Sequence, residues 1–320
     1  MPTGGERELE LRKWTKQGIL GLLSFILVCG TFLGTGGKPA AAADSYNAFR
    51  NASVKGPLIA GLGEGNTWVP QGLALVPSKD WVITSHYRGQ ENSWQVSGIV
   101  ITSTTTNKRI KTLYLYDNPI IPHMGNVGGL AVSKNHLWIV SGFTIYKIPL
   151  STLSEKKDNS RVMMTGYEVN HKASYAAYSD GVLWVGEYMD GKDSGKTTCD
   201  AGPNGRLYGY KLNSSDDLSA KPKASYTRAT PDRIQGLAIS KDYIVYSQSC
   251  GRDVSSKLLF YPGSNPAKKL RSVTLPPMAE GISFSGSVLY TLFESGASKY
   301  KGSPYPLKNI YLINTKKLKI

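Results

Sequence analysis

The stretch Gln71-Gly72-Leu73-Ala74-Leu75 decides the fold, because its pattern returns four more times along the chain. A tight polar turn follows it at 78–80, and an apolar, aromatic-rich segment comes next at 81–87. Equivalent phrases begin at positions 128, 173, 235 and 280, and the segment after the turn ends at 86, 142, 187, 248 and 294. The two sets of positions advance together in steps of 45 to 62 residues. The repeat therefore indicates five copies of one structural unit.

Each unit has the pattern of a small antiparallel sheet. A third apolar segment follows the first two in every unit, and a fourth follows in four of the five. Short strands joined by turn residues, with no helical periodicity, are typical of a β-propeller blade. We therefore predict an all-β fold over residues 44–320, a five-bladed β-propeller of four-stranded antiparallel blades. The alternative is a many-stranded β-sandwich, which would not show matching turn residues at equivalent positions.

The fifth unit lacks a segment for its outer strand before the chain stops at Ile320. The apolar stretch at 54–62 has no other place in the repeat, so we expect it to complete this blade. The N-terminal strand would then close the ring and cover an otherwise open sheet edge.

Composition and the N-terminus narrow the class of protein. The 320 residues carry a formal net charge of +15, 40% hydrophobic residues and 34 glycines, which excludes a disordered chain, a collagen and a polytopic membrane protein. Residues 1–43 combine a basic start, an apolar run at 18–33 and Ala41-Ala42-Ala43, the pattern of a secretory signal peptide. An uncleaved membrane anchor is the alternative. We expect a secreted or cell-envelope-associated protein without a membrane span after cleavage.

The mature chain would keep two cysteines, Cys199 and Cys250. Both fall in predicted loops on the same face of adjacent blades, and export usually leads to an oxidising compartment. We therefore predict a disulfide between them, with two free thiols as the alternative.

The repeat units share an order of features: Gly-Leu/Ile-Ala, then a polar turn, then a strand that ends in a polar residue. This order supports a resemblance to known β-propellers. The chain resembles the broad superfamily of NHL-type, gluconolactonase-like and phytase-like propellers over essentially all of residues 44–320. The resemblance implies the fold but no single chemistry, because those relatives include lactonases, phosphatases, nucleotidases and binding modules. The five-blade count is also similar to that of calcium-dependent apyrases, although their catalytic motif is not matched here.

Two rings of polar side chains are expected at the top of the central funnel. First strands line the channel of a propeller, second strands end at its top face, and loops on a rigid scaffold carry most ligand sites. The expected positions are Gln71, Gln235 and Glu280 from the first strands and His86, Glu187, Gln248 and Glu294 from the second strands.

Three carboxylates brought together need a cation between them or strongly shifted pKa values. Oxygen-rich sites suit Ca²⁺, so we predict a divalent metal, Ca²⁺, held by Glu187, Glu280 and Glu294. We assign catalytic roles to His86, Glu187 and Glu294, with His86 as a general base. The alternatives are glutamines that only bond between blades, and glutamates neutralised by Arg252 or Lys299 without a ligand.

Basic and aromatic side chains are expected around this funnel, and they suit an anionic small molecule or a cell-envelope polymer. We predict ligand-binding roles for Gln71, Gln235, Gln248, His123 and Arg252. Nucleic acid is disfavoured as a partner by export. The predicted function is that of a monomeric, secreted, metal-dependent hydrolase of a phosphoester or lactone. The alternatives are a non-enzymatic propeller that binds a glycan, wall polymer or protein, and a structural envelope protein.

Overall fold

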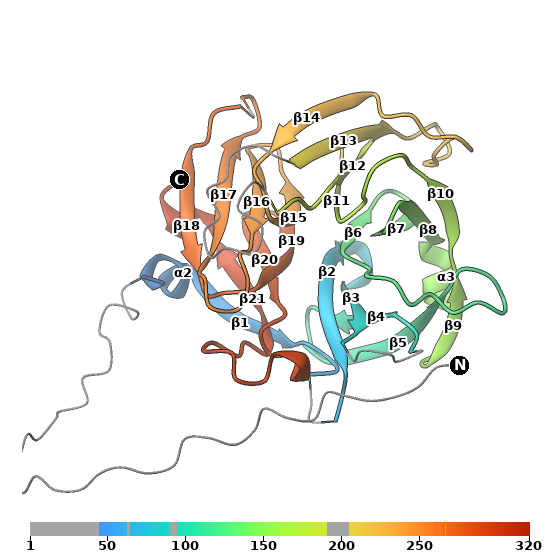
Figure 1. The fold of residues 1–320 in the computed structure, drawn as a ribbon, viewed down its shortest axis with the longest axis horizontal. Helices are drawn as coiled ribbons and strands as arrows, with labels where there is room; N and C mark the ends of the chain where they lie inside the picture. Colours follow the sequence, from blue (N-terminus) through green and yellow to red (C-terminus); the bar gives the residue numbers. More distant parts are fainter. Residues whose placement is uncertain (1–44, 63–64, 90–94, 191–204, 266) are drawn as a thin grey trace, which may run out of the picture. The chain divides into compact units, whose positions relative to one another are not determined.

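The computed structural model describes residues 45–62, 65–89, 95–190, 205–265 and 267–320. These residues form five small β-sheets that follow one another around a central axis (Figure 1). The predicted all-β, five-bladed propeller is therefore confirmed.

Four of the five blades contain four antiparallel strands, as the sequence predicted. Blade two holds β6 (Gly129–Val132), β7 (His136–Ser141), β8 (Thr144–Pro149) and β10 (Thr165–Glu168). Blade three holds β11 (Tyr175–Ser179), β12 (Val182–Gly186), β13 (Gly205–Lys211) and β14 (Tyr226–Thr230). Blade four holds β15 (Ile234–Ile239), β16 (Tyr243–Gln248), β17 (Ser256–Pro262) and β18 (Arg271–Leu275).

Blade one departs from the predicted four-stranded plan. It contains β2 (Trp68–Val76), β3 (Trp81–Arg88), β4 (Gly98–Ser103) and β5 (Arg109–Tyr116), and β9 (Ser160–Met163) is added parallel to β5. The fourth apolar segment of the second repeat unit lies at 161–169, and its first half belongs to blade one, whereas its second half forms β10 of blade two. Asp158 explains the division, because it accepts hydrogen bonds from the Arg109 guanidinium and from the Thr112 amide, and so holds this segment against β5.

Blade five combines the two ends of the described chain. Its order is β1 (Ser53–Leu58), β21 (Asn309–Asn314), β20 (Val288–Phe293) and β19 (Ala279–Ser285). Strand β1 runs antiparallel to β21, with Ser53 opposite Ile313, so the N-terminal segment provides the outer strand expected for this blade. The short helix α2 (Asn47–Ala52) precedes β1 and buries Phe49 against Phe293 and Tyr311.

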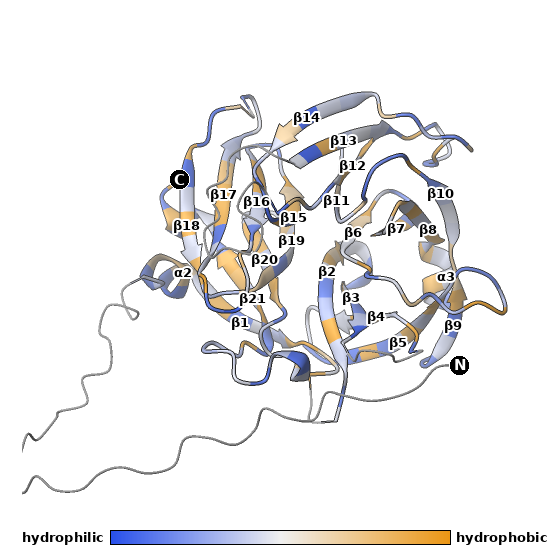
Figure 2. Cartoon of the chain, viewed as in Figure 1, coloured by the Kyte–Doolittle hydropathy of each residue, from blue (hydrophilic) through white to orange (hydrophobic). Residues whose placement is uncertain are grey.

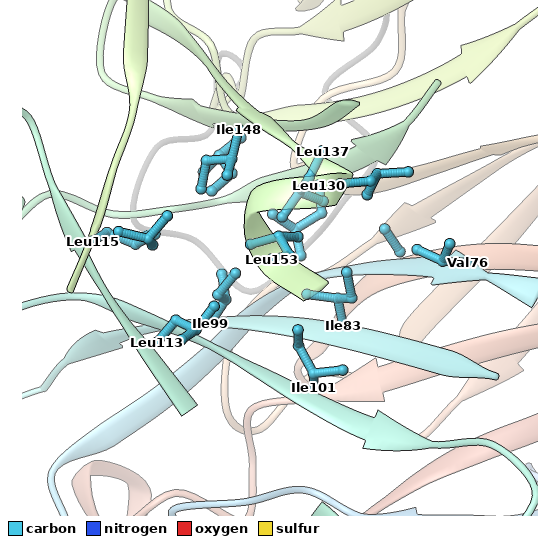
Figure 3. Close-up of a cluster of buried hydrophobic side chains, with 14 of the residues drawn as sticks. Val76, Ile83, Ile99, Ile101, Leu113, Leu115, Leu130, Leu137, Ile148 and Leu153 are labelled. Atoms are coloured by element: carbon cyan, nitrogen blue, oxygen red, sulfur yellow. The ribbon is translucent and has the colours of Figure 1, made fainter. Parts of the chain in front are cut away.

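The hydrophobic core is divided among the spaces between neighbouring blades. Successive strand residues point to opposite faces, so Val82 packs toward blade five whereas Ile83 packs toward blade two. Figure 2 shows the apolar residues concentrated in the strands of the blades. Figure 3 shows the cluster between blades one and two, where helix α3 (Leu150–Glu155) contributes Leu153. Each blade is thus stabilised mainly by burial against its two neighbours.

Glycines in four of the five blades allow the first strands to approach one another closely at the axis. A Cβ atom on Gly281 would lie 2.5 Å from the Leu73 amide nitrogen, and one on Gly129 would lie 2.5 Å from the Ala176 amide nitrogen. A Cβ on Gly236 would lie 2.5 Å from the Glu280 carbonyl oxygen. Because real Cβ atoms do not approach backbone this closely, the repeated glycine is a packing requirement of the narrow ring.

Within the described ranges, no helix combines the length and hydrophobicity needed to cross a membrane.

Replacing Gly281 with alanine is expected to destabilise the protein by roughly 2–4 kcal/mol, because the new methyl group would meet backbone atoms of blade one. Gly166→Ala is the matched control, since its Cβ would meet only the side chains of Thr144 and Tyr146 at 3.2 Å or more. Urea unfolding of both variants measures the difference. Equal stability of the two variants would show that the glycine contacts at the axis carry no special constraint.

The α2–β1 segment is expected to stabilise blade five strongly. Phe49→Ala should lower the free energy of unfolding by about 3–5 kcal/mol, because the ring is 3% exposed and packs on two aromatic residues. Val54→Ala, at a position 61% exposed on β1, should change it by no more than about 0.5 kcal/mol. Thermal and urea denaturation test this, and an unchanged midpoint for Phe49→Ala would contradict it.

Candidate functional site

A cavity of about 510 Å³, lined by both polar and apolar residues, lies where the first strands begin, at the top face of the ring. Its lining includes Gln71, Ser141, Lys172, Tyr188 and Gln235, contributed by four different blades. Below it the glycine contacts narrow the axis to a space of about 10 Å³, and a second cavity of about 160 Å³ opens at the opposite face between alanine and aliphatic residues. A ligand in the upper cavity therefore meets both polar and apolar wall residues above a closed floor.

Two carboxyl groups of blade five are buried beside this cavity. Glu280 is 1% exposed and Glu294 is 8% exposed, and their side chains hydrogen-bond to each other. Gln71 Nε2 donates to Glu294 Oε2 at 3.0 Å, and Gln235 Nε2 donates to Glu280 Oε1 at 3.1 Å. The structure thus brings together four of the predicted site residues, from blades one, four and five.

Burial controls the protonation of this carboxyl pair. It raises the pKa of Glu280 well above the usual value, and the neighbouring Glu294 raises it further. Burial also raises the pKa of Glu294, to about 7, although a hydrogen bond from Tyr300 and the charge of Lys299 oppose the rise. Two carboxyl groups in direct contact cannot both ionise cheaply, so the pair holds a shared proton near neutral pH.

An aromatic and basic group borders the carboxyl pair on its outer side. The hydroxyl of Tyr300 hydrogen-bonds to Glu294, and Tyr87 hydrogen-bonds to Tyr300. Lys299 Nζ donates to the Tyr87 hydroxyl at 3.0 Å, and the Arg252 guanidinium lies 5.5 Å from the centre of the Tyr300 ring. The two cations therefore lie next to the tyrosine side chains that border the carboxyl pair, and a ligand-binding role for Arg252 stays a prediction.

Glu187 interacts with a different set of charges. Burial raises the pKa of its carboxyl, and the charges of Arg206 and Lys172 partly offset that rise. Throughout the part of the chain that the structure describes, no group of three or more His, Cys, Asp or Glu residues is placed to hold a metal ion. The expected gathering of Glu187 with Glu280 and Glu294 is therefore not found.

His86 and Gln248 are turned into their own blades. The His86 ring is fully buried 5.0 Å from the Trp68 ring, its Nε2 lies 2.8 Å from Thr84 Oγ1, and burial lowers its pKa to about 3. Gln248 Nε2 donates to the Asp232 carbonyl and carboxylate oxygens at 3.0 and 3.1 Å. Both residues belong to strands, in which successive side chains point to opposite faces of the sheet. Glu294 instead follows the end of β20, where this alternation no longer applies. The sequence alignment placed all three in one ring without that distinction.

His123 is buried between two polar partners, one of which, Ser141, lines the upper cavity. Its Nδ1 is 2.8 Å from Asp117 Oδ1, and its Nε2 is 3.1 Å from Ser141 Oγ. Ser141 ends β7 and lines the cavity. Sequence reasoning singled out His123 but missed Asp117 and Ser141. The sequence offers one signal for Ser141, because this residue precedes Gly142, where the second segment of its repeat unit ends.

The residues around the carboxyl pair do not fit Ca²⁺, which takes six to eight oxygen ligands. The two carboxyl groups hydrogen-bond to each other, and both glutamines direct a nitrogen, not an oxygen, toward them. Calcium binding stays a prediction, and no chemical step is derived through a metal. The predicted disulfide also stays a prediction, because Cys199 lies outside the described residues.

No protein-family model and no curated protein matches this chain. Among solved structures, a GH43_1 enzyme from Xanthomonas citri is similar, with a TM-score of 0.51 and 12% identity over 84% of this chain and 92% of that one. Glutaminyl cyclase from Myxococcus xanthus has a TM-score of 0.46 and 9% identity over 82% of this chain and 94% of that one. Such low identity shows similarity of fold alone, and the NHL-type and gluconolactonase-like resemblance is not confirmed.

The carboxyl pair predicts a distinct pH dependence of stability. The pKa of Glu294 is about 7 in the folded protein against an ordinary value of 4.5, so the folded state binds the proton more tightly than the unfolded state. Its contribution is therefore complete below about pH 4.5 and is lost as the pH rises through about 7. The loss is on the order of a few kcal/mol.

Glu294→Gln should remove the part of this slope that Glu294 contributes, which urea unfolding at about pH 5 and about pH 8 would measure. Buried Glu280, whose pKa is also raised, should keep the rest of the slope. Glu168→Gln, at an exposed position on β10, is the control and should leave the slope unchanged. A slope in Glu294→Gln that equals the wild-type slope would show that Glu294 does not contribute to it.

Proposed function

We propose that the upper cavity binds a small hydroxylated molecule with an anionic group, and that the protein is a hydrolase acting on it. The observation that carries the proposal is the fixed orientation of Gln71 and Gln235, both of which line the cavity. Gln71 Nε2 donates to the Pro70 carbonyl and to Glu294, and Gln235 Nε2 donates to Glu280. The amide oxygens are left to accept hydrogen bonds from ligand hydroxyl groups.

The cavity also offers a cation and a hydroxyl group to an anionic ligand. Lys172 is exposed and lines the same cavity, together with Tyr188. Arg252 and Lys299 lie around Tyr300 next to the carboxyl pair, and the chain has an excess of 15 positive charges. This charge distribution favours the approach of anions such as sugar phosphates or acidic cell-envelope polymers. Secretion, proposed from residues 1–43, would bring the protein to such partners.

The hydrolytic part of the proposal rests on the carboxyl pair. A carboxyl group with a pKa of about 7 exchanges its proton readily near neutral pH, which general acid–base catalysis requires. Two carboxyl groups in direct hydrogen bond are closer than the roughly 5–9.5 Å that separates the two carboxylates of glycosidases. The pair therefore favours hydrolysis of an ester over cleavage of a glycosidic bond by two separated carboxylates.

The second candidate is a binding module without catalysis, and the burial of the carboxyl pair favours it. Glu280 and Glu294 lie behind the glutamines that line the cavity, and they bind to residues from blades one and four. The pair would then serve to orient the glutamines and to join three blades. Glycans and wall polymers with many hydroxyl groups would be its ligands.

Glucose 6-phosphate and glucose form a matched pair of probes for the cavity. We expect glucose 6-phosphate to raise the thermal midpoint more than glucose does, because only the phosphate attracts Lys172. Lys172→Ala should weaken glucose 6-phosphate binding roughly fivefold in calorimetry and leave glucose binding unchanged. Lys55→Ala, on the outer strand β1, is the control that should change neither. Absence of any shift with both probes, or an equal effect of Lys55→Ala, would contradict the proposal.

A further inference from the structure

Asp117, His123 and Ser141 have the mutual geometry of a nucleophilic relay. Asp117 Oδ1 lies 2.8 Å from His123 Nδ1, and His123 Nε2 lies 3.1 Å from Ser141 Oγ. The carboxylate thus fixes which ring nitrogen carries a proton, and Nε2 faces the serine hydroxyl as an acceptor. A hydroxyl, a base and a group that orients the base are the parts that an activated serine requires.

Backbone bonds hold the relay in place. The His123 amide donates to the Leu115 carbonyl at 2.9 Å, and the His123 carbonyl accepts from the Ser97 amide at 2.7 Å. The Tyr146 ring packs edge-on against the imidazole, with 5.1 Å between ring centres. Ser141 ends β7, where the chain reverses at Gly142, whose φ is 62°. The hydroxyl is therefore presented from a rigid hairpin rather than from a long loop.

Ser141 lies at a wall of the upper cavity. Gly125 lies next to the hydrogen bond between Ser141 and His123. Ser141, Gly125 and Gly142 all line the cavity. A Cβ atom on Gly125 would lie 2.7 Å from Ser141 Oγ and 3.0 Å from His123 Nε2. Any side chain at residue 125 would therefore push the serine and histidine apart, so the relay depends on glycine at this position.

Two other serines show the ordinary structural use of such a hydroxyl. Ser85 lies within β3, the corresponding strand of blade one, where it donates to the Val127 carbonyl and accepts from the Gly72 amide. Ser133, at the other end of blade two, donates to the Asp216 carboxylate and accepts from Trp138 Nε1. In Ser141 the hydroxyl instead faces an imidazole nitrogen whose opposite nitrogen is bound by a carboxylate, and it borders a cavity.

We propose that Ser141 is the nucleophile of an acyl-transfer hydrolase, with His123 as the general base and Asp117 as the positioning residue. This inference rests on the proposed function in that the substrate occupies the same cavity. Ser141 Oγ forms a bond to the carbonyl carbon of a carboxylic ester while its proton passes to His123 Nε2. The bond from that carbon to the alcohol oxygen breaks, and the alcohol leaves with the proton from His123.

Water completes the cycle by the reverse proton path. It attacks the acyl carbon and gives a proton to His123, and the bond to Ser141 Oγ breaks as this proton returns to the serine. The products are a carboxylic acid and an alcohol, with the enzyme unchanged. The amide oxygens of Gln71 and Gln235 line the same cavity and suit a hydroxylated portion of the ester.

Diisopropyl fluorophosphate tests the nucleophile without requiring the natural ligand, because an activated serine displaces its fluoride and keeps the phosphoryl group. We expect peptide mass spectrometry to locate one adduct on Ser141 of the full, folded chain. Ser141→Ala should abolish labelling, and His123→Gln should slow it at least 100-fold. Ser133→Ala is the matched control and should label at the wild-type rate. Asp117→Asn should slow labelling and also change its pH profile, which a merely structural role would not do.

Thermal melts show whether each variant is folded. The adduct is located on the wild-type chain, so this part of the test holds even if a variant fails to fold. Absence of an adduct on Ser141, or labelling of folded His123→Gln at the wild-type rate, would overturn the assignment. If labelling fails while glucose 6-phosphate still binds, the nucleophile is wrong and the ligand site stands. If labelling succeeds and no sugar ligand binds, the nucleophile stands and the proposed ligand class is wrong.

Discussion

Five β-strands pass the axis of this propeller within backbone contact of one another, and glycine permits that approach. The methyl group of an alanine at Gly129, Gly236 or Gly281 would overlap main-chain atoms of the adjacent blade. A five-bladed ring is small for a propeller and leaves little room at its axis, so the innermost strands bear this constraint. The hydrophobic clusters between the blades can form only because the axis closes in this way.

The same constraint explains the character of the upper cavity. Backbone atoms close the axis. The side chains at the starts of the first strands therefore point toward the top face and toward one another. Glu280 is pressed against Glu294 of its own blade, and glutamines of blades one and four complete their hydrogen bonds. A buried pair of this kind persists only when its polar atoms are satisfied, which gives the mouth of the cavity a defined arrangement.

The cavity thus has two chemically different walls. One is formed by glutamines supported by a carboxyl pair that shares a proton, and the other carries Ser141 with His123 and Asp117 behind it. The first wall has the properties of a site that recognises hydroxyl groups, and the second has those of a site that reacts with a carbonyl group. The proposed recognition and the proposed reaction would thus use different walls of one cavity, in agreement with the general rule that function resides in sites built on a common fold.

The sequence by itself determined the architecture, because the period of the repeat, the turn residues and the glycines each report a local backbone requirement. It also placed Gln71, Gln235, Glu280 and Glu294 at one site, since all four are attached to that repeat. Only the tertiary structure decided the direction of individual side chains, such as His86, which a strand turns into its own blade. It also brought Asp117, His123 and Ser141 together, because the 23 residues between Asp117 and Ser141 hold no motif that predicts their contact. Local backbone geometry is encoded locally, whereas a site formed by distant side chains depends on packing.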